Sequence, residues 1–153
     1  MKKQIKIILL LVVSIAFSTL LYPTVVGLWA TVYIPYTHIF PRTHFFSGAW
    51  LSIGAASGAA ICAFIIALPL GYLTKEKPII VGSALGIIAT AIHVVIFSSI
   101  IDVFSWFNGI ITFVEHLSFI LSCIVFARWG SYLATKKLLN GEPQATDGRT
   151  AAP

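Results

Sequence analysis

Charged residues are scarce in this sequence of 153 residues. They make up 10% of the chain, where a soluble domain has about 25%, and hydrophobic residues make up 58%. Acidic residues are fewer than basic ones, with five Asp and Glu against ten Lys and Arg, and the net charge is +5. This composition excludes an ordinary soluble domain and indicates a membrane protein.

Cysteine and the usual catalytic motifs are also missing or rare. The two cysteines, Cys62 and Cys123, lie in separate apolar runs, which excludes a CxxC redox pair and a zinc site built from closely spaced thiols. The sequence contains no G-x-S-x-G, H-E-x-x-H or phosphate-binding loop. We therefore expect no enzymatic activity and no cofactor.

Four long apolar segments are present instead, and each is close to the roughly 20 residues that span a bilayer. They cover residues 5–22, 46–73, 79–101 and 109–131, and the last continues as helix to about 139. The short connections 74–78 and 102–108 make neighbouring helices antiparallel. We predict an all-α membrane protein with four transmembrane helices that form an antiparallel bundle, in which the second, third and fourth helices pack in sequence order. This domain covers residues 1–140, and the polar tail 141–153 is predicted to be disordered.

The first segment and the connection after it allow more than one interpretation. Its basic start would suit a signal peptide, but the apolar run is long, and we predict an uncleaved helix. The connection 23–46 is rich in aromatic residues and holds three prolines. We predict a structured cap on the outer face, since Pro23 can end the first helix. The alternative is one kinked helix to about Ile34.

The basic residues predict the orientation of the bundle. With the N-terminus inside, nine of the ten lie on the inner side and Arg42 alone lies outside. Those on the inner side are Lys2, Lys3, Lys6, Lys75, Lys77, Arg128, Lys136, Lys137 and Arg149. The positive-inside rule then places both termini in the cytoplasm, which favours a bacterial inner membrane. Basic residues at the ends of apolar segments do not form a nucleic-acid-binding stripe, so we expect no nucleic acid partner.

Small residues recur at four-residue spacing along the second and third segments. They are Gly48, Ser52, Gly54, Gly58, Gly82 and Gly86. In lipid, helices associate through close backbone packing, which small side chains permit. The spacing predicts tight packing between the second and third helices, or alternatively a face for a dimer.

Three ionisable residues, His93, Glu115 and His116, lie inside the predicted spans. Such residues are costly in lipid and usually face the interior of a bundle. In an antiparallel hairpin of the third and fourth helices they fall at similar depth, and His93 shares the face of Gly82. We predict an intramembrane polar cluster.

Four further polar residues are predicted near the outer surface. They are His38, Arg42, His44 and Asp102. They suit ordinary outer loops, although His and Asp side chains also bind metals.

Three functions remain open from the sequence. The first is a non-enzymatic accessory protein or subunit that acts through helix contacts in the lipid bilayer, with another membrane protein or with itself. The second is a small transporter or proton-linked channel component that uses Glu115 with His93 and His116. The third is a haem- or metal-binding membrane protein, in which the two histidines supply ligands from adjacent helices.

Overall fold

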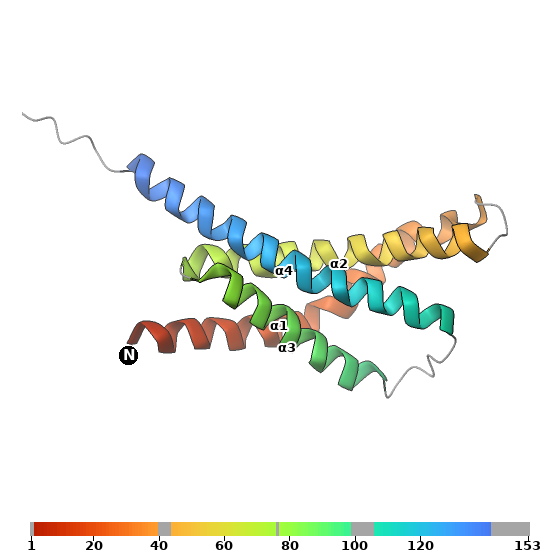
Figure 1. Ribbon diagram of the computed structural model, residues 1–153, viewed down its shortest axis with the longest axis horizontal. Helices are drawn as coiled ribbons and strands as arrows, with labels where there is room; N and C mark the ends of the chain where they lie inside the picture. The colour runs from red at the N-terminus through yellow and green to blue at the C-terminus, as the bar shows by residue number, and fades with distance from the viewer. Residues whose placement is uncertain (1, 40–43, 76, 99–105, 142–153) are drawn as a thin grey trace, which may run out of the picture.

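The computed structural model is all-helical and describes residues 2–39, 44–75, 77–98 and 106–141. Its elements are α1 (Lys2–Tyr33), the 3₁₀ helix η1 (Ile34–Ile39), α2 (His44–Thr74), α3 (Pro78–Ser98) and α4 (Trp106–Gly141). The start of α1, the turn between α2 and α3, and the last part of α4 all lie at one end of the bundle (Figure 1). The predicted four-helix antiparallel architecture is therefore confirmed.

All four α-helices are long and apolar enough to cross a membrane. The candidate spans are Gln4–Thr37, Phe46–Thr74, Pro78–Ile96 and Gly109–Leu138. Large apolar side chains such as Leu20 and Val95 are more than 70% exposed, which would be unfavourable in water but suits lipid contact. We conclude that this is a multi-pass membrane protein in contact with a bilayer.

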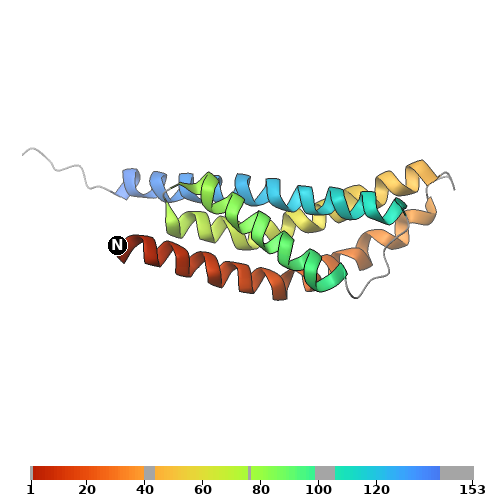
Figure 2. The same cartoon turned by 60° about the horizontal axis from the view of Figure 1, so that its bottom comes forward.

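Helix α1 continues through Pro23 instead of ending there. It runs to Tyr33 and is followed directly by η1, so Pro23 does not end the first helix. Residues 40–43 of the predicted outer segment lie outside the described residues. Proline removes a backbone donor and clashes with the preceding turn, which bends the helix without ending it. Figure 2 shows α1 changing direction in its middle. The alternative of a kinked helix to about Ile34 is the arrangement observed.

The predicted packing of the second, third and fourth helices in sequence order holds for α3 and α4 but is wrong for α2 and α3. Helix α4 packs against both α2 and α3, whereas α2 and α3 have little contact with each other. A Cβ atom on Gly71 of α2 would overlap the carbonyl of Ala127 on α4, and one on Gly130 of α4 would overlap that of Leu68. These two glycines let α2 and α4 approach more closely than other residues would allow.

The predicted glycines do pack tightly, but against other helices than expected. A Cβ atom on Gly86 would lie 2.9 Å from Cα of Ile120 on α4, and one on Gly82 would lie 2.7 Å from the Cys123 carbonyl oxygen. On α2, Gly54 lies against the ring of Tyr33 and Gly58 against the side chain of Trp29, both on α1. Gly48 is buried and Ser52 is half-buried. The prediction that these residues join the second helix to the third is therefore wrong.

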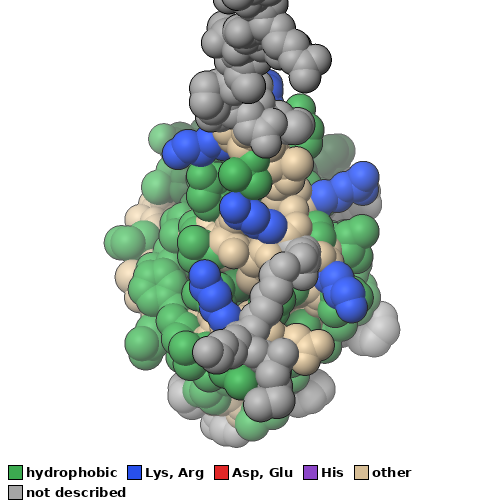
Figure 3. Space-filling view, turned by 90° about the vertical axis from the view of Figure 1, so that its left-hand side faces the viewer, with side chains coloured by type: hydrophobic (Ala, Val, Ile, Leu, Met, Phe, Trp, Pro, Cys, Tyr) green, Lys and Arg blue, Asp and Glu red, His purple; other side chains and the backbone are tan. Residues whose placement is uncertain are grey.

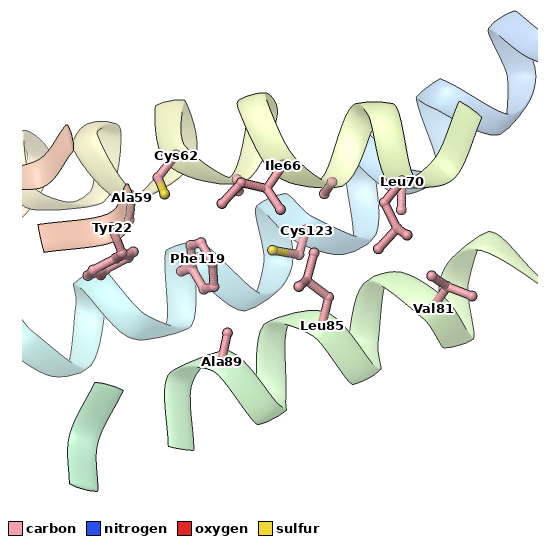
Figure 4. Close-up of a cluster of buried hydrophobic side chains, with 13 residues drawn as sticks. Tyr22, Ala59, Cys62, Ile66, Leu70, Val81, Leu85, Ala89, Phe119 and Cys123 are labelled. Carbon is pink, nitrogen blue, oxygen red and sulfur yellow. The ribbon is translucent and has the colours of Figure 1, made fainter. Parts of the chain in front are cut away.

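The core lies where α4 meets the other helices. Its largest fully buried apolar side chains are Phe119, Leu70 and Leu85, with alanines filling the narrow gaps between helices. Cys62 and Cys123 are buried free thiols that point into this core from α2 and α4 (Figure 4). They act as small packing residues.

Candidate functional site: a polar cluster around Tyr22

Tyr22 of α1 is the centre of the polar groups inside the bundle. The continuation of α1 through Pro23 keeps Tyr22 in the middle of a helix, where its side chain is 6% exposed. Its hydroxyl donates a hydrogen bond to Oε1 of Glu115 at 2.6 Å. This distance is at the short end of the range for O–H···O bonds. Nδ1 of His116 lies 3.5 Å from the same hydroxyl.

His93 approaches the other side of the site from α3. The imidazole is 1% exposed, and its ring centroid lies 4.3 Å from that of Tyr22 with an interplanar angle of 34°. The contact between His93 and Tyr22 therefore joins α3 to α1.

Phe119 of α4 completes the cluster. Its ring meets the Tyr22 ring edge-on, with centroids 5.1 Å apart, and lies 6.2 Å from the His93 ring. Edge-to-face pairs of this kind are favourable beyond the area that they bury. Figure 4 shows Tyr22 beside Phe119 at one end of the apolar core, with Ala59 and Cys62 of α2 nearby. We call Tyr22, His93, Glu115, His116 and Phe119 the Tyr22 cluster.

Two buried hydroxyl groups lie one turn away from members of this cluster. Ser18 precedes Tyr22 by four residues on α1, and Thr90 precedes His93 by three residues on α3. Within the described part of the chain, neither hydroxyl has a hydrogen-bond partner. Buried hydroxyl groups normally have a partner, often an ordered water molecule. Polar groups therefore extend from the cluster along both α1 and α3.

The structure brings the three predicted intramembrane residues together. Glu115 and His116 are half-buried, His93 is buried, and all three contact Tyr22. Sequence reasoning missed Tyr22, because it placed the end of the first helix at this residue. The available signal was a tyrosine followed directly by proline within a longer apolar run.

The predicted outer-face residues fall where the structure describes no side chain. Arg42 and Asp102 lie outside the described residues, and so do the side chains of His38 and His44. A polar site that includes them stays a prediction. Among the residues that the structure describes, no group of three or more His, Cys, Asp or Glu side chains is placed to hold a metal ion.

Other polar contacts fasten the helices to one another away from the cluster. Nε1 of Trp29 on α1 donates to Oγ of Ser57 on α2 at 2.8 Å, and Oγ of Ser118 on α4 donates to the Ala56 carbonyl at 3.0 Å. Nε1 of Trp50 donates to the Tyr33 carbonyl at 2.9 Å. Hydrogen bonds between helices are thus a general feature of this bundle, and the Tyr22–Glu115 bond is one of them.

Comparison with known protein families, with characterised proteins and with solved structures gave no match to this chain.

Proposed function

We propose that this protein is a non-enzymatic accessory protein or subunit of a bacterial cytoplasmic membrane, which acts through contacts of its helices. The observation that supports this most directly is the hydrogen bond between Tyr22 and Glu115. It uses the intramembrane carboxyl group to connect the first helix to the last. His93 packs on the same tyrosine ring from α3. On this proposal the cluster serves to hold the helices in register.

The orientation in the membrane is part of the proposal. The described basic side chains gather at the end that holds the N-terminus and the last part of α4, which supports a cytoplasmic location for both termini. A reporter fused after Pro153 tests this. A cytoplasmic reporter signal is expected, and an extracytoplasmic signal would overturn the orientation.

The accessory role is tested by purification in a mild detergent followed by native mass spectrometry. We expect a second membrane protein to co-purify with this chain at a fixed stoichiometry. When the affinity tag is placed on that second protein instead, we expect it to co-purify with this chain. A mass that is a multiple of 16.6 kDa would identify the partner as another copy of this chain. A single chain carrying only lipid and detergent would overturn the proposal.

Proton-linked transport is a second candidate, because four proton-carrying groups lie in contact. The Glu115 carboxyl group and the His116 imidazole share the Tyr22 hydroxyl, and His93 lies against the Tyr22 ring. Contiguous groups of this kind form proton relays in membrane transporters. The buried hydroxyl groups of Ser18 and Thr90 would lengthen such a relay on α1 and α3.

Proteoliposomes that contain a pH-sensitive dye separate the two candidates. Proton transport predicts a flux that Glu115→Gln abolishes while the amount of folded protein is unchanged. The accessory role predicts no flux above that of empty liposomes for either protein. We advance no haem or metal site, because both imidazoles of the cluster pack against the Tyr22 ring.

A further inference from the structure

One end of the bundle carries a concentration of positive charge. The described basic side chains there are Lys6, Lys75, Lys77, Arg128, Lys136 and Lys137. Figure 3 looks onto this end and shows basic side chains around it, with no acidic side chain visible among the described residues. Within the described part of the chain, Glu115 is the sole acidic residue, and it is engaged by Tyr22 inside the bundle. Among the described residues, no carboxylate is therefore available to neutralise these lysines and Arg128.

Two of these charges, Lys75 and Lys77, flank the turn between α2 and α3. Lys75 and Lys77 have φ angles of 56° and 47°, in the left-handed region that residues other than glycine rarely adopt. Both side chains are exposed. The sequence also has Glu76 between them, outside the described residues, so the turn keeps a net charge of +1.

Neighbouring helices hold this unusual turn in place. Oγ of Ser131 on α4 donates a hydrogen bond to the Lys75 carbonyl at 2.7 Å, and the Lys75 N–H donates to the Gly71 carbonyl at 3.0 Å. Gly71 and Gly130 allow the close approach of α2 and α4 just below the turn. A backbone conformation of this kind persists only where its surroundings fix it. The Lys75 end of the turn is therefore fastened to α4 by a hydrogen bond.

Exposed apolar side chains flank the same turn. Leu73 precedes the lysines, and Ile79 and Ile80 follow them at the start of α3; each is more than half exposed. On α4, Trp129 and Tyr132 are exposed near Ser131 and suit the boundary between water and lipid. Cationic groups beside an exposed apolar surface match a molecule with an anionic head and hydrocarbon chains.

We propose that this end of the protein binds anionic phospholipid, and that the Lys75–Lys77 turn is the main contact for the headgroup. The acyl chains lie along the apolar side chains of α2 and α3 beside the turn. Basic clusters next to membrane helices attract anionic lipids in this way. A free phosphate compound would obtain its binding free energy from the lysines alone, because it has no acyl chain to place against Leu73, Ile79 and Ile80. This binding is independent of the accessory role proposed above.

Native mass spectrometry of the full chain in mild detergent tests the proposal. The protein is mixed with equal amounts of phosphatidylglycerol and phosphatidylcholine, and the bound lipids are counted. We expect a clear preference for phosphatidylglycerol that weakens as the salt concentration rises. Equal binding of the two lipids would overturn the proposal. Retention of glycerol 3-phosphate as strongly as phosphatidylglycerol would also overturn it, because the acyl chains would then contribute nothing.

A pair of variants with equal loss of charge tests the role of the turn. Lys75→Gln/Lys77→Gln is expected to reduce the preference for phosphatidylglycerol by roughly tenfold, since each basic group near an anionic surface contributes substantially to binding. Lys136→Gln/Lys137→Gln removes the same charge from exposed positions on α4 and is expected to have a smaller effect. An equal loss in the two variants would mean that net charge alone attracts the lipid, which would contradict a site at the turn. In each variant, protection of Cys62 and Cys123 from a thiol reagent verifies that the variant is folded.

Discussion

The hydroxyl of Tyr22 donates a hydrogen bond to Oε1 of Glu115 at 2.6 Å and so connects α1 to α4. No Cα atom of α1 lies within 8 Å of a Cα atom of α4 in the described part of the chain. Contact between the first and last helices therefore depends on long side chains that reach across the bundle. Tyr22 is long enough to do so, and Phe119 of α4 packs against its ring from the other helix.

Replacing Glu115 should reveal whether its carboxyl group serves as a hydrogen-bond acceptor. Glu115→Leu leaves the buried Tyr22 hydroxyl without its acceptor and should lower the free energy of unfolding by about 1–3 kcal/mol. Glu115→Gln keeps an acceptor oxygen and should cost much less. Unfolding in increasing SDS, followed by circular dichroism, measures both. If both variants lowered the free energy of unfolding equally, the hydrogen bond from Tyr22 to this acceptor would not stabilise the protein.

The glycines at helix contacts should tolerate substitution very differently from those that face open space. Gly71→Ala places a methyl group against the Ala127 carbonyl and should destabilise the protein by about 1–3 kcal/mol, since α2 and α4 must move apart. Among the described residues, no other part of the protein lies within 4 Å of a Cβ atom added at Gly27 or Gly109. Alanine at either position should be neutral or stabilising by up to about 1 kcal/mol, because alanine favours helix. The same SDS unfolding assay compares them, and a harmless Gly71→Ala would contradict the close contact.

The two native thiols should be protected from chemical modification while the protein is folded. Cys62 and Cys123 are both 0% exposed. We expect no reaction with N-ethylmaleimide in mild detergent and modification of both thiols after denaturation in SDS, as seen by intact mass. The variant Leu138→Cys supplies an exposed thiol near the end of α4 as a positive control. If the native thiols reacted in the folded protein as fast as the control, the core around them would be open to the reagent.

The architecture could be predicted from sequence because it depends on simple quantities. The length of the apolar runs sets the number of helices, and short connections make neighbours antiparallel. The choice of packing partner depends on shape, which four-residue spacing does not encode. Gly82 and Gly86 show that one face of α3 allows close approach, but the sequence does not say that α4 occupies that face.

The polar cluster was only partly predictable for a related physical reason. His93, Glu115 and His116 stood out because charge-bearing side chains are rare in apolar spans. Tyr22 did not stand out, since tyrosine is common where a helix meets the membrane surface and Pro23 suggested that the helix ended there. Tyr22 lies inside the bundle because α1 continues through Pro23 and packs against α2 and α3, which the sequence alone does not reveal.

A double-mutant cycle on Tyr22 and Glu115 tests most directly the claim that this pair holds the bundle together. It compares the free energies of unfolding of the native protein, Tyr22→Phe, Glu115→Leu and the double variant. Interhelical hydrogen bonds in membrane proteins contribute about 0.6 kcal/mol on average and about 1.7 kcal/mol at most. We predict a coupling energy of about 0.6–1.7 kcal/mol. The free energy of unfolding of the double variant should therefore fall by less than the sum of the decreases in the two single variants. Losses that add to within about 0.3 kcal/mol would contradict the claim.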